Sequence, residues 1–236
     1  MDGIRLIISL ATVTAIITNR VSAAEEDGVA LAIVYDTSGS MKEPVRDRTG
    51  KPTPKYVIAN RALEAIAARI DTFATRSGPG APRKVHAGLF VFEGAGARQA
   101  VKFGPFDAVA LKNWAQRFSD PQGGTPLGNA LKEASQAVLD SGLTRKHVLV
   151  ITDGINTAGP DPATVLTGLK QLAEQKQSSL SVHFVAFDVN AKVFDGVKKL
   201  GATVVGASDE AQLNGQLGII LEKKILLEDE EPQKKK

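Results

Sequence analysis

The stretch from Val29 to Met41 constrains the fold of this chain more than any other part of the sequence. It reads VALAIVYDTSGSM, in which an unbroken apolar run is followed by an acid, small hydroxyl residues and a glycine. A short apolar run bounded by turn residues is typical of a strand that is buried on both faces. We therefore expect a strand that ends at Asp36, with a tight polar loop after it.

A second apolar run, His147 to Thr152, also stops at an acid, Asp153. Between and after these runs, apolar residues recur at helical spacing, and shorter apolar runs indicate further strands. We expect helices over residues 56–73, 107–118, 125–139, 163–175, 191–200 and 209–227, and strands over 85–92, 100–103, 180–187 and 203–205. This alternation predicts an α/β fold with a doubly wound, mostly parallel sheet flanked by helices and one short antiparallel edge strand.

The segment Lys42 to Lys55 reads KEPVRDRTGKPTPK and shows no periodic apolar pattern. Its three prolines and one glycine indicate a loop. Because it begins directly after the polar turn that follows Asp36, we expect its basic side chains to surround that turn. These side chains are Lys42, Arg46, Arg48, Lys51 and Lys55.

Composition excludes several classes of function. The chain has 29 basic and 26 acidic residues, so no excess of positive charge favours a nucleic-acid partner. It has no cysteine, which excludes disulfides, thiolate metal sites and cysteine nucleophiles. The three histidines lie in or beside different strand patterns, so we interpret them as sheet residues rather than as a zinc site.

The first residues match the template of an export signal. Arg5 supplies a positive charge, Leu6 to Ile17 is mainly apolar, and Val21-Ser22-Ala23 offers small residues for cleavage. The apolar run is shorter than the roughly 20 residues that cross a bilayer. We expect a signal peptide over 1–23, a domain over 24–227 with no membrane span, and a disordered charged tail over 228–236. The protein would then be periplasmic or secreted; a retained anchor is the alternative.

Oxygen-bearing side chains follow the two apolar runs and also precede one predicted helix. Asp36, Ser38 and Ser40 alternate after the first strand, Thr125 lies in the sequence GGTP, and Asp153 lies in TDG. Ligands in open α/β sheets bind beyond the carboxyl ends of strands, and hard oxygen donors suit Mg²⁺ or a similar ion. Taken one at a time, these segments are also compatible with ordinary turns or, for Thr125, with a helix cap.

Together, the pattern D-x-S-x-S, the Thr of GGTP and the Asp of TDG resemble a von Willebrand factor type A domain, of an exported bacterial type. The resemblance extends over about Val29 to Leu221 and implies a Rossmann-like fold with a metal-ion-dependent adhesion site. It assigns the ligands of Mg²⁺, or of Mn²⁺ or Ca²⁺, to Asp36, Ser38, Ser40, Thr125 and Asp153.

The physical chemistry of these residues favours the same grouping. Two carboxylates about 5 Å apart repel each other by ~3 kcal/mol at an effective dielectric constant of 20, and a divalent ion removes that conflict. With few anionic ligands, the ion keeps an open position that suits a carboxylate from outside. We therefore expect a protein partner that presents an Asp or Glu.

Two other functions use the same residues. A metal-assisted hydrolase needs a general base, and the three loops contain no His or Lys. A metal-free scaffold that keeps only the fold would have lost some ligand positions, and all five are present. We therefore expect a non-enzymatic, metal-dependent module for protein binding in adhesion or assembly.

Overall fold

The computed structural model describes residues 25–75 and 83–226. The expected signal peptide, 1–23, and the expected tail, 228–236, lie outside the described residues, as does residue 227 at the end of the expected domain.

A six-stranded sheet forms the centre of the molecule, in the order β5-β4-β1-β6-β7-β8. All neighbours are parallel except β4 and β5, as the sequence predicts for a doubly wound sheet with one antiparallel edge strand. That edge strand is longer than expected because it pairs along most of β4. The strands are β1 (Glu26–Tyr35), β4 (Val85–Glu93), β5 (Gly96–Pro105), β6 (Leu143–Thr152), β7 (Ser181–Phe187) and β8 (Thr203–Ala207).

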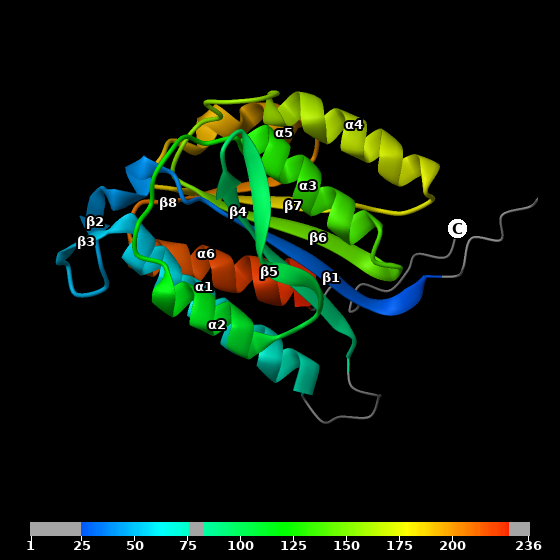
Figure 1. Cartoon of the computed structure of the whole chain (residues 1–236), viewed down its shortest axis with the longest axis horizontal. Helices are drawn as coiled ribbons and strands as arrows, with labels where there is room; N and C mark the ends of the chain where they lie inside the picture. The colour runs from blue at the N-terminus through cyan, green and yellow to red at the C-terminus, as the bar shows by residue number, and fades with distance from the viewer. Residues whose placement is uncertain (1–24, 76–82, 227–236) are drawn as a thin grey trace, which may run out of the picture.

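Helices cover both faces of the sheet (Figure 1). One face carries α1 (Lys55–Thr75), α2 (Ala108–Arg117) and α6 (Glu210–Ile220), which continues into a π-helical segment, η3 (Leu221–Leu226). The other face carries α3 (Leu127–Leu139), α4 (Pro162–Gln175) and α5 (Asp195–Lys199), which follows a short 3₁₀ turn, η2 (Ala191–Phe194). Two layers of helices around one sheet explain why β1 is apolar at every position from Val29 to Tyr35.

The side chains of β1 divide between the two helical layers. Leu31, Ile33 and Tyr35 pack on the α1 side, whereas Ala32 and Val34 pack on the α3 side. All are fully buried. The Tyr35 hydroxyl donates a hydrogen bond to Asn60 Oδ1 at 2.7 Å, so the polar end of this side chain is also satisfied.

The start of two helices tests the expected caps. Asp107, the first residue of the helix expected over 107–118, caps α2, because its Oδ1 accepts a hydrogen bond from Ala110 N at 2.9 Å. Helix α3 instead begins at Leu127 with Pro126 in the cap position, so Thr125 does not cap it. The side chain of Thr125 is therefore not engaged as a helix cap.

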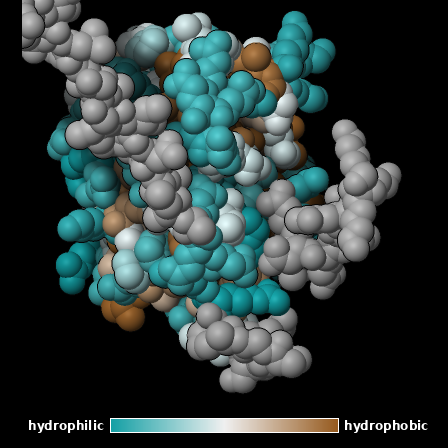
Figure 2. Space-filling model, turned by 90° about the vertical axis from the view of Figure 1, so that its right-hand side faces the viewer, coloured by the Kyte–Doolittle hydropathy of each residue, from teal (hydrophilic) through white to brown (hydrophobic). Residues whose placement is uncertain are grey.

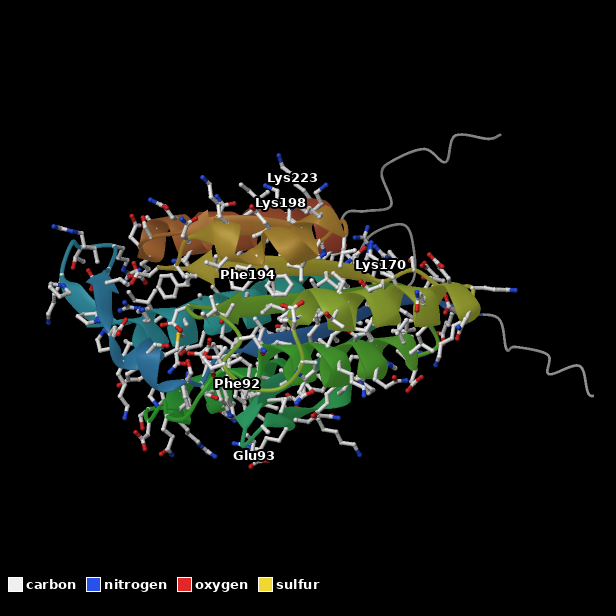
Figure 3. The ribbon with its side chains drawn as sticks, turned by 90° about the horizontal axis from the view of Figure 1, so that it is seen from above. Phe92, Glu93, Lys170, Phe194, Lys198 and Lys223 are labelled. Carbon is white, nitrogen blue, oxygen red and sulfur yellow. The ribbon has the colours of Figure 1, made fainter. Side chains whose placement is uncertain are left out.

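The segment from Lys42 to Lys55 is more ordered than a loop. After a 3₁₀ turn, η1 (Gly39–Lys42), the strands β2 (Pro44–Arg46) and β3 (Pro52–Pro54) form an antiparallel hairpin. It lies at the carboxyl edge of the sheet, the end at which β1, β6 and β7 terminate (Figures 1 and 3). The expectation of a simple loop was wrong because polar contacts organise the hairpin, and these leave no apolar period in the sequence.

Asp47 supplies most of those polar contacts. Its Oδ1 accepts hydrogen bonds from Thr49 Oγ1 at 2.7 Å, from Thr49 N at 2.9 Å and from Lys51 N at 3.0 Å. Its Oδ2 accepts one from Thr53 Oγ1 at 3.0 Å. These hydrogen bonds, led by the one from the Thr49 hydroxyl, hold the pKa of Asp47 well below its usual range.

Figure 2 shows the opposite end of the molecule, at which β1 begins. Where its described residues are visible, this surface is mainly hydrophilic. Within residues 25–75 and 83–226, no helix combines the length and the apolar character that crossing a membrane requires.

We predict that Asp47→Asn loosens the hairpin without unfolding the sheet. The lowered pKa means that the ionised carboxylate stabilises the hairpin above the usual Asp range near pH 4 and that this contribution is lost as the pH falls. At pH 6, hydrogen exchange measured by NMR should speed up at the amides of Thr49 and Lys51. Asp71→Asn, at an exposed position on α1, is the control. Unchanged protection of both amides in Asp47→Asn would contradict the role of Asp47.

Candidate metal centre

Asp36 is the first residue after β1 and is completely buried. Its Oδ1 accepts a hydrogen bond from Ser38 N at 2.8 Å, which closes the tight turn. Its Oδ2 accepts one from the hydroxyl of Thr152, at the end of β6, at 2.5 Å. The turn after β1 is thus attached to the end of β6 through a single carboxylate.

The hydroxyls of Ser38 and Ser40 extend this contact toward Asp153. Their Oγ atoms lie 3.1 Å apart, and Ser40 Oγ donates a hydrogen bond to Asp153 Oδ1 at 2.8 Å. Four of the five residues selected from the sequence therefore form one connected group of oxygen atoms. The group joins the loops that follow β1 and β6.

Thr125 lies beside this group and is buried. A Cβ atom placed on Gly154 would come within 3.3 Å of Thr125 Oγ1, which places the hydroxyl next to the residue that follows Asp153. The backbone around Thr125 is fixed on one side by Thr157, whose N donates to Thr125 O at 2.9 Å. On the other side, Gly39 N donates to Gly123 O at 3.1 Å. The third loop thus meets the other two.

The donor set fits a small divalent cation. Two carboxylates and three hydroxyls supply only hard oxygen ligands, the type that Mg²⁺ and Ca²⁺ take. In the described part of the chain, no group of three or more His, Asp or Glu side chains is placed to hold a metal. An ion bound here would therefore need the hydroxyl oxygens as well as the two acids.

The electrostatics of Asp36 also favour a nearby cation. The pKa of Asp36 is raised to about 6, mainly by burial and in addition by the charge of Asp153, although the hydrogen bonds from Ser38 and Thr152 lower it. A buried carboxylate in this position is costly to ionise without a positive charge nearby. A divalent ion would provide that charge.

The structure shows two acids near the centre that the sequence did not single out, Glu43 and Asp188, and both contact Lys55. Lys55 Nζ lies 2.8 Å from Asp153 Oδ2, 3.0 Å from Glu43 Oε2 and 3.3 Å from Asp188 Oδ2. We expected Lys55 to lie beside the turn that follows Asp36, and its contact with Asp153 places it at the centre. Its side chain is buried at the start of α1, whereas the other four basic residues of the segment, Lys42, Arg46, Arg48 and Lys51, are exposed.

Burial alone would lower the pKa of Lys55. The hydrogen bonds and charges of Asp153 and Glu43 outweigh burial, so the pKa lies well above its usual value. Lys55 is therefore positively charged throughout the physiological range.

Comparison with known proteins agrees with this arrangement. The family model described as von Willebrand factor type A domain matches residues 31–156, more than half of the chain, and this range includes all five candidate ligands. The chain belongs to the von Willebrand factor type A domain family. A search of curated proteins finds no match.

Solved structures share the fold of this von Willebrand factor type A domain at low sequence identity. The PilB minor pilin from Streptococcus sanguinis superposes with a TM-score of 0.63 at 14% identity, over 88% of this chain and 64% of the pilin. Proximal thread matrix protein 1 from the mussel byssus, solved with a zinc occupied MIDAS motif, superposes with a TM-score of 0.58 at 18% identity, over 84% of this chain and 49% of that protein. The chain thus spans less than two thirds of the length of either protein.

We predict that Asp36→Ala abolishes binding of Mg²⁺ and Mn²⁺, because it removes one of only two carboxylates in the centre. Titration calorimetry measures the binding, and circular dichroism checks that the sheet remains folded. Asp120→Ala is the matched control, since Asp120 is an exposed acid whose partner is the exposed Lys42. Unchanged affinity for both ions in Asp36→Ala would refute the assignment.

Proposed function

We propose that this domain binds a divalent cation through Asp36, Ser38, Ser40, Thr125 and Asp153 and uses it to dock an acidic group of a protein partner. The ion would be Mg²⁺, or Mn²⁺ or Ca²⁺. The observation that carries the proposal is the hydrogen-bonded group of Asp36, Ser38, Ser40 and Asp153 at the carboxyl edge, with the buried Thr125 beside it. Because three of the five donors are neutral hydroxyls, the protein neutralises the ion only in part, and a carboxylate from outside suits an open position.

The surface beside the centre supports a protein as the partner. Ile155 and Val193 are among the large hydrophobic side chains that are exposed, at 57% and 46%. Both line one cavity of about 160 Å³, together with the buried Phe194, which Figure 3 labels. Asn156 and Asp161 also line this cavity, so its wall is partly polar. Its volume is large enough for a single apolar side chain, since about 150 Å³ holds a molecule the size of benzene.

The loop that follows Asp153 connects the metal centre with the cavity, because its residues Ile155 and Asn156 line the cavity. Asn156 Oδ1, in this loop, accepts a hydrogen bond from Gly128 N at 3.1 Å. The loop also lies so close to α3 that a Cβ atom on Gly128 would come within 2.0 Å of Pro160 O. Only glycine allows this approach. The position of Ile155 is therefore fixed relative to Asp153, and a partner could present an acid and an apolar residue together.

A binding role suits these residues better than catalysis. A metal-assisted hydrolase needs a general base within reach of the reacting proton. The basic side chain in contact with the centre is Lys55, and its raised pKa keeps it protonated. The zinc in the MIDAS motif of the mussel protein supports metal binding by a protein of this fold.

Affinity capture tests the proposal. We expect the immobilised full chain to retain a partner from an envelope extract in Mg²⁺, to release it in EDTA, and to retain none as Asp36→Ala. Once that partner is purified, Ile155→Ser should weaken its binding several-fold and leave Mn²⁺ affinity unchanged, because Ile155 contributes an apolar contact. Retention of the same proteins in Mg²⁺ and in EDTA would contradict docking through the ion.

We also propose that the protein is exported and that the signal peptide is cleaved. Glu25, close to the proposed cleavage site, forms an ion pair with the buried Lys146 at 2.5 Å, so cleavage that keeps Glu25 preserves a contact of the folded domain. A mature chain that begins at Ala24 or at Glu25 meets this requirement. We expect mass spectrometry of the envelope fraction to find one of these two N-termini. An intact Met1 would instead indicate a retained membrane anchor.

A further inference from the structure

Lys55 is a buried cation that three carboxylates from three different loops surround. Its side chain is 3% exposed, whereas those of Glu43 and Asp188 are 68% and 41% exposed. Glu43 follows η1, Asp153 follows β6 and Asp188 follows β7. One ammonium group thus connects the ends of three segments at the carboxyl edge.

The backbone at Asp188 adopts an uncommon conformation that places its carboxylate beside Lys55. Asp188 has φ of +55°, in the left-handed region that residues other than glycine rarely adopt. Its N–H donates a hydrogen bond to Ala207 O at 2.7 Å, which holds the backbone in this conformation. Unfavourable conformations of this kind persist where the surrounding structure fixes them, often at functional sites. Here the conformation brings a carboxylate to Lys55.

The two carboxylate oxygens of Asp153 have different partners. Oδ2 is paired with the ammonium at 2.8 Å, and Oδ1 accepts the hydrogen bond from Ser40. The carboxylate is therefore held in one orientation, with Oδ1 directed toward the other candidate ligands. The positive charge of Lys55 also offsets the repulsion between Asp153 and Asp36, the task otherwise assigned to the metal ion.

We propose that Lys55 is a built-in cation that keeps the metal centre assembled before an ion binds and that lowers the affinity of the centre for that ion. The inference rests on the proposed metal centre. Two consequences follow from it. Without Lys55, the metal-free domain is less stable, because Asp153 becomes a buried and unpaired charge. The ion also binds more tightly, because it no longer shares Asp153 with another cation.

Lys55→Met tests both consequences, since methionine keeps much of the length of the side chain and removes the charge. We expect the dissociation constant for Mn²⁺, measured by calorimetry, to fall about tenfold as one nearby positive charge is removed. In EDTA, the melting temperature of Lys55→Met should lie roughly 5–10 °C below that of the native chain. Saturating Mn²⁺ should then raise the melting temperature of the variant by more than it raises that of the native chain. Lys198→Met, at an exposed position on α5 and outside the basic segment 42–55, should change neither quantity.

Asp188→Asn is a second variant, which should change the affinity for Mn²⁺ in the opposite direction to Lys55→Met. Asparagine tolerates the left-handed backbone, so the fold is kept while one negative charge beside Lys55 is lost. Lys55 is then less neutralised and repels the ion more, so Mn²⁺ should bind a few-fold more weakly than in the native chain. This variant decides the question if Lys55→Met does not fold.

The outcomes separate this inference from the proposed metal centre. If the native chain binds Mn²⁺ and Lys55→Met binds it equally or more weakly, the role of Lys55 is overturned and the centre remains. Binding in Asp188→Asn as tight as in the native chain also overturns the role of Lys55. If neither the native chain nor Lys55→Met binds Mn²⁺, both the centre and the inference are wrong.

Discussion

The parallel pairing of β1 with β6 is the constraint on which the rest of this structure depends. It sets Tyr35 opposite Ile151, so Asp36, one residue further, and Asp153, two residues further, reach the same edge of the sheet. Helices on both faces remove this edge from water, as the burial of both acids shows. The fold thus concentrates two negative charges in a place where water stabilises them poorly, and other groups must compensate.

Three kinds of group compensate for the two negative charges: hydrogen-bond donors, one ammonium group and, if bound, a divalent ion. Hydrogen bonds from Ser38 and Thr152 stabilise Asp36 without adding charge, and Ser40 does the same for Asp153. Lys55 then adds one positive charge on the side of Asp153 away from Ser40. A divalent ion would complete the balance near the hydroxyls, where no cationic side chain of the described residues is in contact.

The sequence predicted those parts of the structure that local pattern or strand ends determine. The apolar run before Asp36 defines β1, and the acids at the ends of two strands indicate a shared edge. The same reasoning places Thr152 at this edge, because it ends the strand before Asp153, but only the observed register sets it opposite Asp36. The burial of Lys55 was beyond this reasoning, because it depends on three carboxylates far apart in sequence and on the point at which α1 begins. The β2–β3 hairpin was missed for a similar reason, since the contacts of Asp47 have no periodic signature.

Docking through such an edge would divide recognition among three kinds of contact. The exposed Lys42, Arg46, Arg48 and Lys51 act over distances comparable with the Debye length, so salt screens their contribution, which is mainly to the rate of encounter. An ion at this centre would act only on a carboxylate in direct contact with it. The cavity beside Ile155 would add a requirement of shape, since it is large enough for one apolar side chain. The basic side chains would attract many acidic proteins. Tight binding would require that one partner places an acid on the ion and an apolar side chain in the cavity at the same time, and this double requirement would give selectivity.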